Sequence, residues 1–239
     1  MIYIDRQDAG KQLATKLLDI REVSKDVVVI ALPRGGVVLG YEVAKALVAP
    51  LGIVLVRKIG HPYSSEYAIG AVAENGVSVY DASEVRLIDR LWLRDAEVAA
   101  QRVIAQRKIE YYGRDLRLVA IKGKTAIVID DGIATGLTMR AAIESVRKCQ
   151  PKKLIVAVPI GPKDVVRNLK KLVDKIVILE SPEDFMGAIG AYYENFEQVS
   201  DEEVKSLLKE ARNDLRKAIA KNRPVVGSSP SNYIPSFAG

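Results

Sequence analysis

Five short, β-branched apolar runs constrain the fold of this chain more than any other feature of its sequence. Helical patterns follow the first, third and fourth of these runs, over residues 37–48, 137–149 and 163–173. Nearly continuous hydrophobicity is typical of strands buried on both faces of a parallel sheet. Strand and helix in alternation predict right-handed βαβ units and an α/β fold with a doubly wound, mostly parallel sheet of about five strands. The runs are DVVVIAL (26–32), GIVLVRK (52–58), TAIVIDD (125–131), KLIVAVPI (153–160) and DKIVILE (174–180).

Two segments interrupt this alternation. Residues 68–81 carry an Asn75-Gly76 pair between alternating apolar residues, which predicts a β-hairpin. The charged stretch 83–117 follows, and we expect it to form a helical insertion of one long helix or two shorter ones.

The end of the chain consists of a helical segment followed by a tail of different composition. The amphipathic pattern over 201–222 predicts a helix capped by Ser200 or Asp201. We therefore expect a single domain over 1–222. The tail 223–239 is rich in Gly, Ser and Pro, and we expect it to be flexible or weakly docked.

Composition excludes several classes of function. Hydrophobic residues make up 49% and charged residues 28% of the 239 residues, as in soluble globular proteins. No apolar run approaches the roughly 20 residues that span a bilayer, and the N-terminus lacks a secretion signal. We expect a cytoplasmic protein that binds no membrane. The net charge of +6 suits an anionic substrate, but it is spread along the chain, which predicts no nucleic-acid partner.

The third apolar run ends in two adjacent aspartates, Asp130 and Asp131, where an open α/β sheet binds its ligands. Two such close carboxylates repel each other unless hydroxyl donors, as on a ribose, or a hydrated Mg²⁺ compensate. The residues from Gly132 to Thr138 combine glycines, hydroxyls and a helix start, which together suit a phosphate. The alternative is a surface turn in which one aspartate caps the helix.

The stretch IVIDDGIATGLTM resembles the phosphoribosyl diphosphate (PRPP) binding motif of the type I phosphoribosyltransferases. The resemblance implies that Asp130 and Asp131 bind the ribose hydroxyls and hold Mg²⁺ through water. It implies a second group of residues for the 5′-phosphate, namely Ala134, Thr135, Gly136, Leu137 and Thr138. The whole chain looks most like the stand-alone "predicted phosphoribosyltransferases" of bacteria and archaea.

The loop LPRGG after the first run resembles the pyrophosphate loop of purine and xanthine phosphoribosyltransferases. It would bind pyrophosphate through Pro33, Arg34, Gly35 and Gly36, although a tight turn with a surface arginine is the simpler alternative.

The second run ends in Arg57 and Lys58, two cations that could neutralise the departing pyrophosphate. In the family a flexible lid follows this strand. It corresponds to residues 59–66 here, with Glu66 as a candidate acid/base group.

The segment 181–199 resembles the hood of hypoxanthine-type enzymes, in which an aromatic residue stacks on the base. Phe185 is the matching residue; it either binds the base or packs in the hood's own small core. Those enzymes have an aspartate just before the Thr-Gly pair, where this chain has Ala134. This difference argues against a 6-oxopurine acceptor.

The resemblance implies an Mg²⁺-dependent phosphoribosyltransferase that transfers the 5-phosphoribosyl group of PRPP to a nitrogenous base and releases pyrophosphate. Its partners would be PRPP, a small-molecule base or nucleotide, and a second copy of the chain in a homodimer. A PRPP- or nucleotide-binding regulator on the same fold, without catalysis, is the alternative. The catalytic candidates are Asp130, Asp131, Arg57, Lys58 and Glu66.

Overall fold

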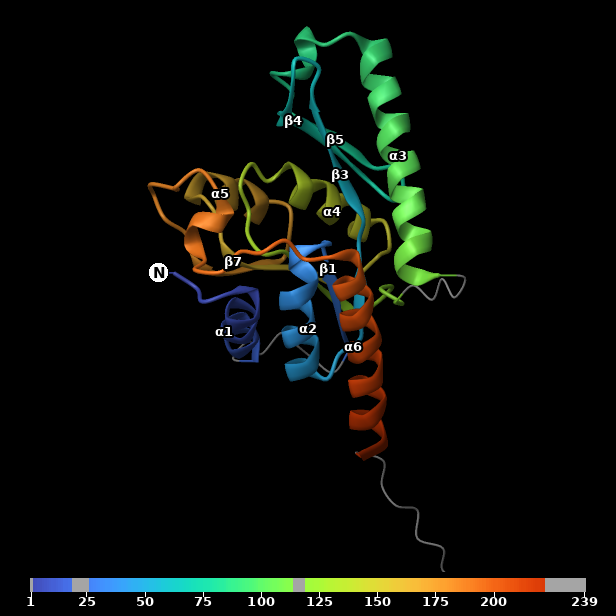
Figure 1. Cartoon of the computed structure of the whole chain (residues 1–239), viewed down its shortest axis with the longest axis vertical. Helices are drawn as coiled ribbons and strands as arrows, with labels where there is room; N and C mark the ends of the chain where they lie inside the picture. Colours follow the sequence, from blue (N-terminus) through green and yellow to red (C-terminus); the bar gives the residue numbers. More distant parts are fainter. Residues whose placement is uncertain (1, 19–25, 114–118, 222–239) are drawn as a thin grey trace, which may run out of the picture.

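A five-stranded parallel sheet forms the centre of the protein in a computed structural model that describes residues 2–18, 26–113 and 119–221 (Figure 1). The strand order is β2-β1-β6-β7-β8, and every neighbouring pair is parallel. The order reverses between β1 and β6, which makes the carboxyl ends of these two strands the switch point of the sheet. The predicted α/β, doubly wound fold is confirmed. The strands are β1 (Val27–Ala31), β2 (Leu51–Ile53), β6 (Thr125–Ile129), β7 (Lys153–Ile160) and β8 (Lys175–Glu180).

Helices cover both faces of this sheet. Successive side chains of a strand point to opposite faces, so each apolar run supplies two cores. In β1, Val27 and Val29 pack with α1, α2 and α6, while Val28 and Ile30 pack with α4 and α5. This two-sided burial explains why the central residues of the runs are apolar without alternation. The helices are α1 (Arg6–Leu18), α2 (Gly35–Leu47), α4 (Leu137–Arg147), α5 (Lys163–Lys170) and α6 (Asp201–Lys221).

A second, antiparallel sheet extends beyond the first with the long helix α3 (Arg90–Tyr112) alongside it (Figure 1). Strands β4 and β5 form the hairpin predicted around Asn75-Gly76, and Gly76 has a φ of 78°. Helix α4 lies between the two sheets, since its Ala141 packs against Ala71 and Val79. The loop before α4 is thereby held between the sheets. The strands are β3 (Val56–His61), β4 (Ser64–Ala73) and β5 (Ser78–Tyr80).

The predicted strand 52–58 is divided in the structure. Strand β2 ends at Ile53 and pairs with β1, whereas β3 begins at Val56 and belongs to the second sheet. Val54 and Leu55 between them are buried, so the apolar run continues although the chain changes sheets. Arg57 and Lys58 therefore lie in the second sheet, rather than at the end of a central strand.

The segments outside the two sheets contain the long helix expected within 83–117 and the helix expected at 201–222, but also α1, which the sequence analysis did not predict. Within 83–117, a short 3-10 turn (Val85–Leu87) precedes α3, and Asp89 caps the helix by accepting from the backbone N–H groups of Leu91 and Trp92. Residues 114–117 and the tail 223–239 lie outside the described residues. In the hood segment, Tyr193 forms a bridge with Tyr3 of the N-terminal segment. Every helix in the described part of the chain is too short or too polar to cross a bilayer.

Candidate active site

A cavity of about 280 Å³ lies at the carboxyl ends of β1 and β6, where the strand order reverses. It brings together residues from both loops predicted at these strand ends, two residues from β3 and one from the hood. The predicted residues that line it are Pro33, Arg34, Gly35, Lys58, Asp130, Asp131, Ala134, Thr135, Gly136 and Thr138. The other lining residues are Val56, Gly132, Ile133, Met139 and Ile189. The cavity thus combines charged and apolar walls.

The two loops touch each other, and glycines make this contact possible. A Cβ atom on Gly35 would lie 2.0 Å from Oδ2 of Asp131. A Cβ atom on Gly36 would lie 2.9 Å from the carbonyl oxygen of Ile129 and 3.0 Å from Cα of Asp130. Gly36 itself does not line the cavity but packs behind the aspartates. The loop after β1 can therefore lie directly against the aspartates only because both positions lack a side chain.

The loop after β6 ends in a helix start without a side-chain cap. Gly136, the N-cap of α4, has a φ of 80°, a conformation that favours glycine. Since Gly136 has no side chain with which to cap α4, the backbone N–H groups of the first turn can face a ligand, and they carry the positive end of the helix dipole. Leu137 contributes backbone only, because its side chain packs between α4 and the second sheet. This arrangement suits a phosphate group.

The two aspartates are poorly compensated electrostatically. Burial, together with the charge of Asp131, raises the pKa of Asp130 well above its usual range, although Lys58 and Arg6 oppose the shift. Burial also raises the pKa of Asp131, and Arg6 opposes this by its charge and a hydrogen bond. The site therefore favours a ligand that brings hydroxyl donors or positive charge to the carboxylates.

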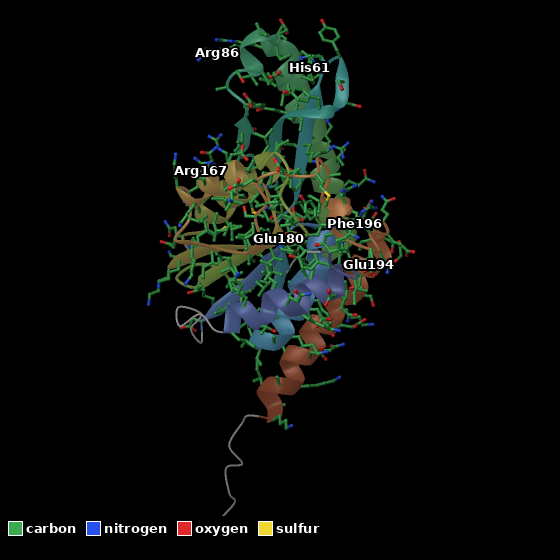
Figure 2. The ribbon with its side chains drawn as sticks, turned by 90° about the vertical axis from the view of Figure 1, so that its left-hand side faces the viewer. His61, Arg86, Arg167, Glu180, Glu194 and Phe196 are labelled. Atoms are coloured by element: carbon green, nitrogen blue, oxygen red, sulfur yellow. The ribbon has the colours of Figure 1, made fainter. Side chains whose placement is uncertain are left out.

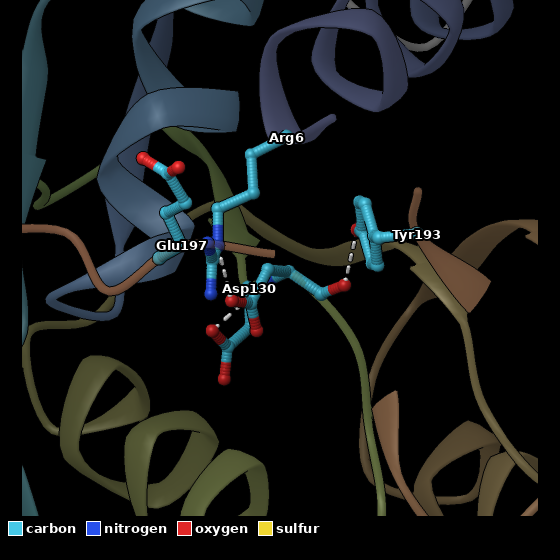
Figure 3. Close-up of polar contacts among 5 residues, drawn as sticks. Arg6, Asp130, Tyr193 and Glu197 are labelled. Carbon is cyan, nitrogen blue, oxygen red and sulfur yellow. Dashed lines mark hydrogen bonds and ion pairs between the residues drawn. The ribbon is translucent and has the colours of Figure 1, made fainter. Parts of the chain in front are cut away.

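Two residues that the sequence did not predict hold Asp131 (Figure 3). Nε of Arg6, at the start of α1, donates to Oδ2 of Asp131 over 2.7 Å. The Tyr193 hydroxyl, from the hood, donates to the backbone carbonyl of Asp131 over 2.6 Å. The backbone N–H of Asp131 in turn donates to Oδ1 of Asp130 over 2.9 Å. Two distant parts of the chain, the start of α1 and the hood, thus fix one aspartate together with its neighbour Asp130.

Some predicted site residues do not line the cavity. Arg57 and Lys58 are both exposed on β3, but only Lys58 lines the cavity, because neighbouring residues of a strand point to opposite faces. The ring of Phe185 stacks on Tyr192, with centroids 5.4 Å apart, and Ile189 lines the cavity instead. This position fits packing within the hood better than base binding, and the base-binding role of Phe185 stays a prediction.

The predicted lid, 59–66, is the paired end of the β3–β4 hairpin. His61 ends β3 and lies at the far end of the second sheet, away from the central sheet (Figure 2). Glu66 belongs to β4, but its side chain lies outside the part that the structure describes. Its acid/base role stays a prediction.

The described residues offer a metal ion only a partial set of ligands. Among them, no group of three or more His, Cys, Asp or Glu side chains could hold a metal. Mg²⁺ prefers oxygen ligands, keeps several waters and is commonly bound by one or two carboxylates together with substrate phosphates. The Asp130–Asp131 pair fits this kind of site.

Comparisons with known proteins identify the family. Residues 4–195 match the phosphoribosyl transferase domain. The chain is 42% identical over 219 residues to "Putative phosphoribosyl transferase Rv0571c" of Mycobacterium tuberculosis, a match that covers 91% of this chain and 48% of that protein. The chain thus spans about half the length of the curated relatives it matches. The crystal structure of TT1426 from Thermus thermophilus is 39% identical with a TM-score of 0.72, covering 88% of this chain and 99% of that one. The chain belongs to the type I phosphoribosyltransferase family.

Proposed function

We propose that the protein transfers the 5-phosphoribosyl group of PRPP to a nitrogenous base and releases pyrophosphate. One observation carries this proposal: the cavity at the switch point joins the loop after β1, the aspartate pair and the N-terminus of α4. PRPP carries a diphosphate, a ribose diol and a 5′-phosphate, so each part of the substrate has a matching group in the cavity.

The roles follow from the chemistry of each wall. Arg34 and Lys58 would balance the charge of the leaving pyrophosphate, a type of stabilisation that grows as the bond to ribose breaks. Asp130 and Asp131 would accept hydrogen bonds from the ribose hydroxyls. The loop from Thr135 to Thr138 would bind the 5′-phosphate through hydroxyls and backbone N–H groups.

The aspartate pair would also hold Mg²⁺ through water when PRPP is bound. The ion would supply positive charge to the pyrophosphate, which the cavity's two cations could not fully neutralise. Holding the ribose and both phosphate groups in one orientation would then present C1 of the ribose to the acceptor.

The acceptor would enter beside Ala134 and Ile189, which both line the cavity. Ala134 has no group that could exchange a proton with a purine. We therefore propose an acceptor other than a 6-oxopurine, or one whose proton goes to a different residue.

Pyrophosphate release from Mg-PRPP, measured with a panel of nitrogenous bases, tests the function. We expect release with at least one base, and its loss in Asp131→Asn. Asp184→Asn, which changes an exposed carboxylate of the hood, is the matched control and should stay active. Binding of Mg-PRPP without release for any base would reject catalysis and favour the alternative of a PRPP-binding regulator.

We also propose that the protein acts as a homodimer, the state expected from the family resemblance. Light scattering coupled to size-exclusion chromatography tests it, and the mass of a single 26.2 kDa chain would reject it.

A further inference from the structure

Arg6 makes three contacts that join separate parts of the chain. Its Nε donates to Oδ2 of Asp131 over 2.7 Å, and its Nη1 donates to the carbonyl oxygen of Glu197 over 2.6 Å. Its guanidinium also lies over the ring of Phe196, 3.7 Å from the centroid. Figure 3 shows Arg6 reaching from α1 toward the aspartates. A planar group with several donors suits such a site better than a lysine would.

The start of α1 is itself fixed, so Arg6 enters from a defined direction. The backbone N–H of Tyr3 donates to the carbonyl of Tyr192 over 2.8 Å, and that of Glu194 donates to the carbonyl of Tyr3 over 2.8 Å. The backbone N–H of Asn195 donates to the carbonyl of Ile4 over 2.9 Å. The N-terminal segment and the hood segment are therefore paired through backbone hydrogen bonds directly before Arg6.

Arg6 lies behind Asp131, outside the substrate cavity. It does not line that cavity but faces a separate one of about 480 Å³, between α1, α2 and α6. The side chains of Arg6 and Asp131 are only 12% and 13% exposed. Arg6 donates to Oδ2 of Asp131 and makes no contact with Oδ1, the second carboxylate oxygen. Because Asp131 lines the substrate cavity and Arg6 does not, Oδ1 is the oxygen that a ligand in the cavity would take.

We propose that Arg6 is a positioning residue that holds the Asp131 carboxylate by one oxygen so that the other accepts a ribose hydroxyl. This inference rests on the proposed function. Arg6 also brings a positive charge to a place where two adjacent carboxylates would otherwise repel each other. It acts on the substrate through Asp131 and does not touch it.

A double-mutant cycle tests whether Arg6 acts through Asp131. Calorimetry gives the Kd for Mg-PRPP of the wild type, Arg6→Gln, Asp131→Asn and the double variant. The control is Lys16→Ala, which removes another cation of α1 whose Nζ donates to a backbone carbonyl, that of Ile178, over 2.6 Å. Thermal unfolding of each protein reports on stability alone.

We expect Arg6→Gln to raise the Kd about tenfold and Lys16→Ala to leave it within about twofold of the wild type. In the Asp131→Asn background, Arg6→Gln should add almost nothing, because the group that it positions is already lost. A purely structural role would lower the unfolding temperature without this dependence on Asp131.

Two results would overturn the proposal: an unchanged Kd in a folded Arg6→Gln variant, or effects that add in the double variant. If Arg6→Gln does not fold, the cycle is run with Arg6→Lys, which keeps the charge but loses the planar two-point contact. Failure of the wild type to bind Mg-PRPP would refute the proposed function, and with it this inference. Wild-type binding with an unchanged variant refutes the role of Arg6 alone.

Discussion

Two buried tyrosines offer a matched pair of substitutions that separates stability from substrate binding. The Tyr193 hydroxyl donates to the carbonyl of Asp131 over 2.6 Å, and the Tyr3 hydroxyl donates to the carbonyl of Pro159 over 3.1 Å. Their rings contact each other, with centroids 5.3 Å apart. Tyr193→Phe and Tyr3→Phe each remove one phenolic hydroxyl and leave the ring packing in place.

Both variants should lose similar stability. Burial raises the pKa of both hydroxyls, and the charge of Asp131 adds to the rise at Tyr193, so both keep their protons and donate at neutral pH. Losing one buried hydrogen bond costs about 1–1.5 kcal/mol of unfolding free energy. For a chain of this length, that corresponds to a fall of roughly 2–6 °C in the unfolding temperature. Differential scanning calorimetry would measure it.

Only Tyr193→Phe should weaken the binding of Mg-PRPP. Without the hydroxyl, the backbone at Asp131 loses the bond that fixes it to the hood, and a carboxylate displaced by a fraction of an ångström binds ribose less well. We expect the Kd to rise roughly threefold to tenfold, while Tyr3→Phe stays near the wild type. Equal Kd values for both variants would refute the reasoning, because shared ring packing would then explain any loss.

Three further substitutions test other parts of the site. Asp130→Asn should raise the unfolding temperature at pH 8 and abolish Mg-PRPP binding. Burial raises the folded-state pKa of Asp130 above its unfolded value of 3.8. The wild type therefore loses stability as the pH rises from 3.8 to the raised folded-state pKa, whereas asparagine does not titrate. Equal pH slopes in thermal unfolding would contradict this. Gly35→Ala should weaken Mg-PRPP binding at least about tenfold in calorimetry, since its Cβ would meet Asp131 at 2.0 Å. Phe185→Leu should lower unfolding free energy by about 1 kcal/mol and leave the KM for the acceptor unchanged, and a raised KM would restore its base-binding role.

The central sheet was predictable because its strands are buried on both faces. Such strands have an apolar signal that needs no knowledge of their partners. The run 52–58 shows the limit of that signal: Val54 and Leu55 are buried in the link between two sheets, so hydropathy is continuous where the chain changes sheets. Helix α1 was not predicted, although Ala9, Leu13 and Leu17 are buried at helical spacing.

The residues of the cavity walls were largely predictable, because most of them belong to two short motifs that directly follow β1 and β6. The residues that orient those walls were not. The contact between Arg6 and Asp131 spans 125 positions of sequence, and that between Tyr193 and Asp131 spans 62. In the hood, Phe185 and Ile189 are both apolar, so hydropathy alone does not predict which of them lines the cavity. Which one lines the cavity depends on the stacking of Phe185 on Tyr192, which is a tertiary contact.

The contacts around Asp131 link the proposed PRPP site to the hood, where we propose that the acceptor binds. The motif after β6 contains the two carboxylates that we propose to bind the ribose, whereas the hood supplies Ile189 to the part of the cavity where we propose that the acceptor enters. Tyr193 of the same hood segment donates a hydrogen bond to the backbone carbonyl of Asp131. The backbone carbonyl of Glu197 accepts a hydrogen bond from Arg6, and Arg6 in turn holds the carboxylate of Asp131. A hood that shifts to admit a different base would therefore move the carboxylate as well. We expect changes in the hood that alter acceptor choice to alter the affinity for PRPP with them.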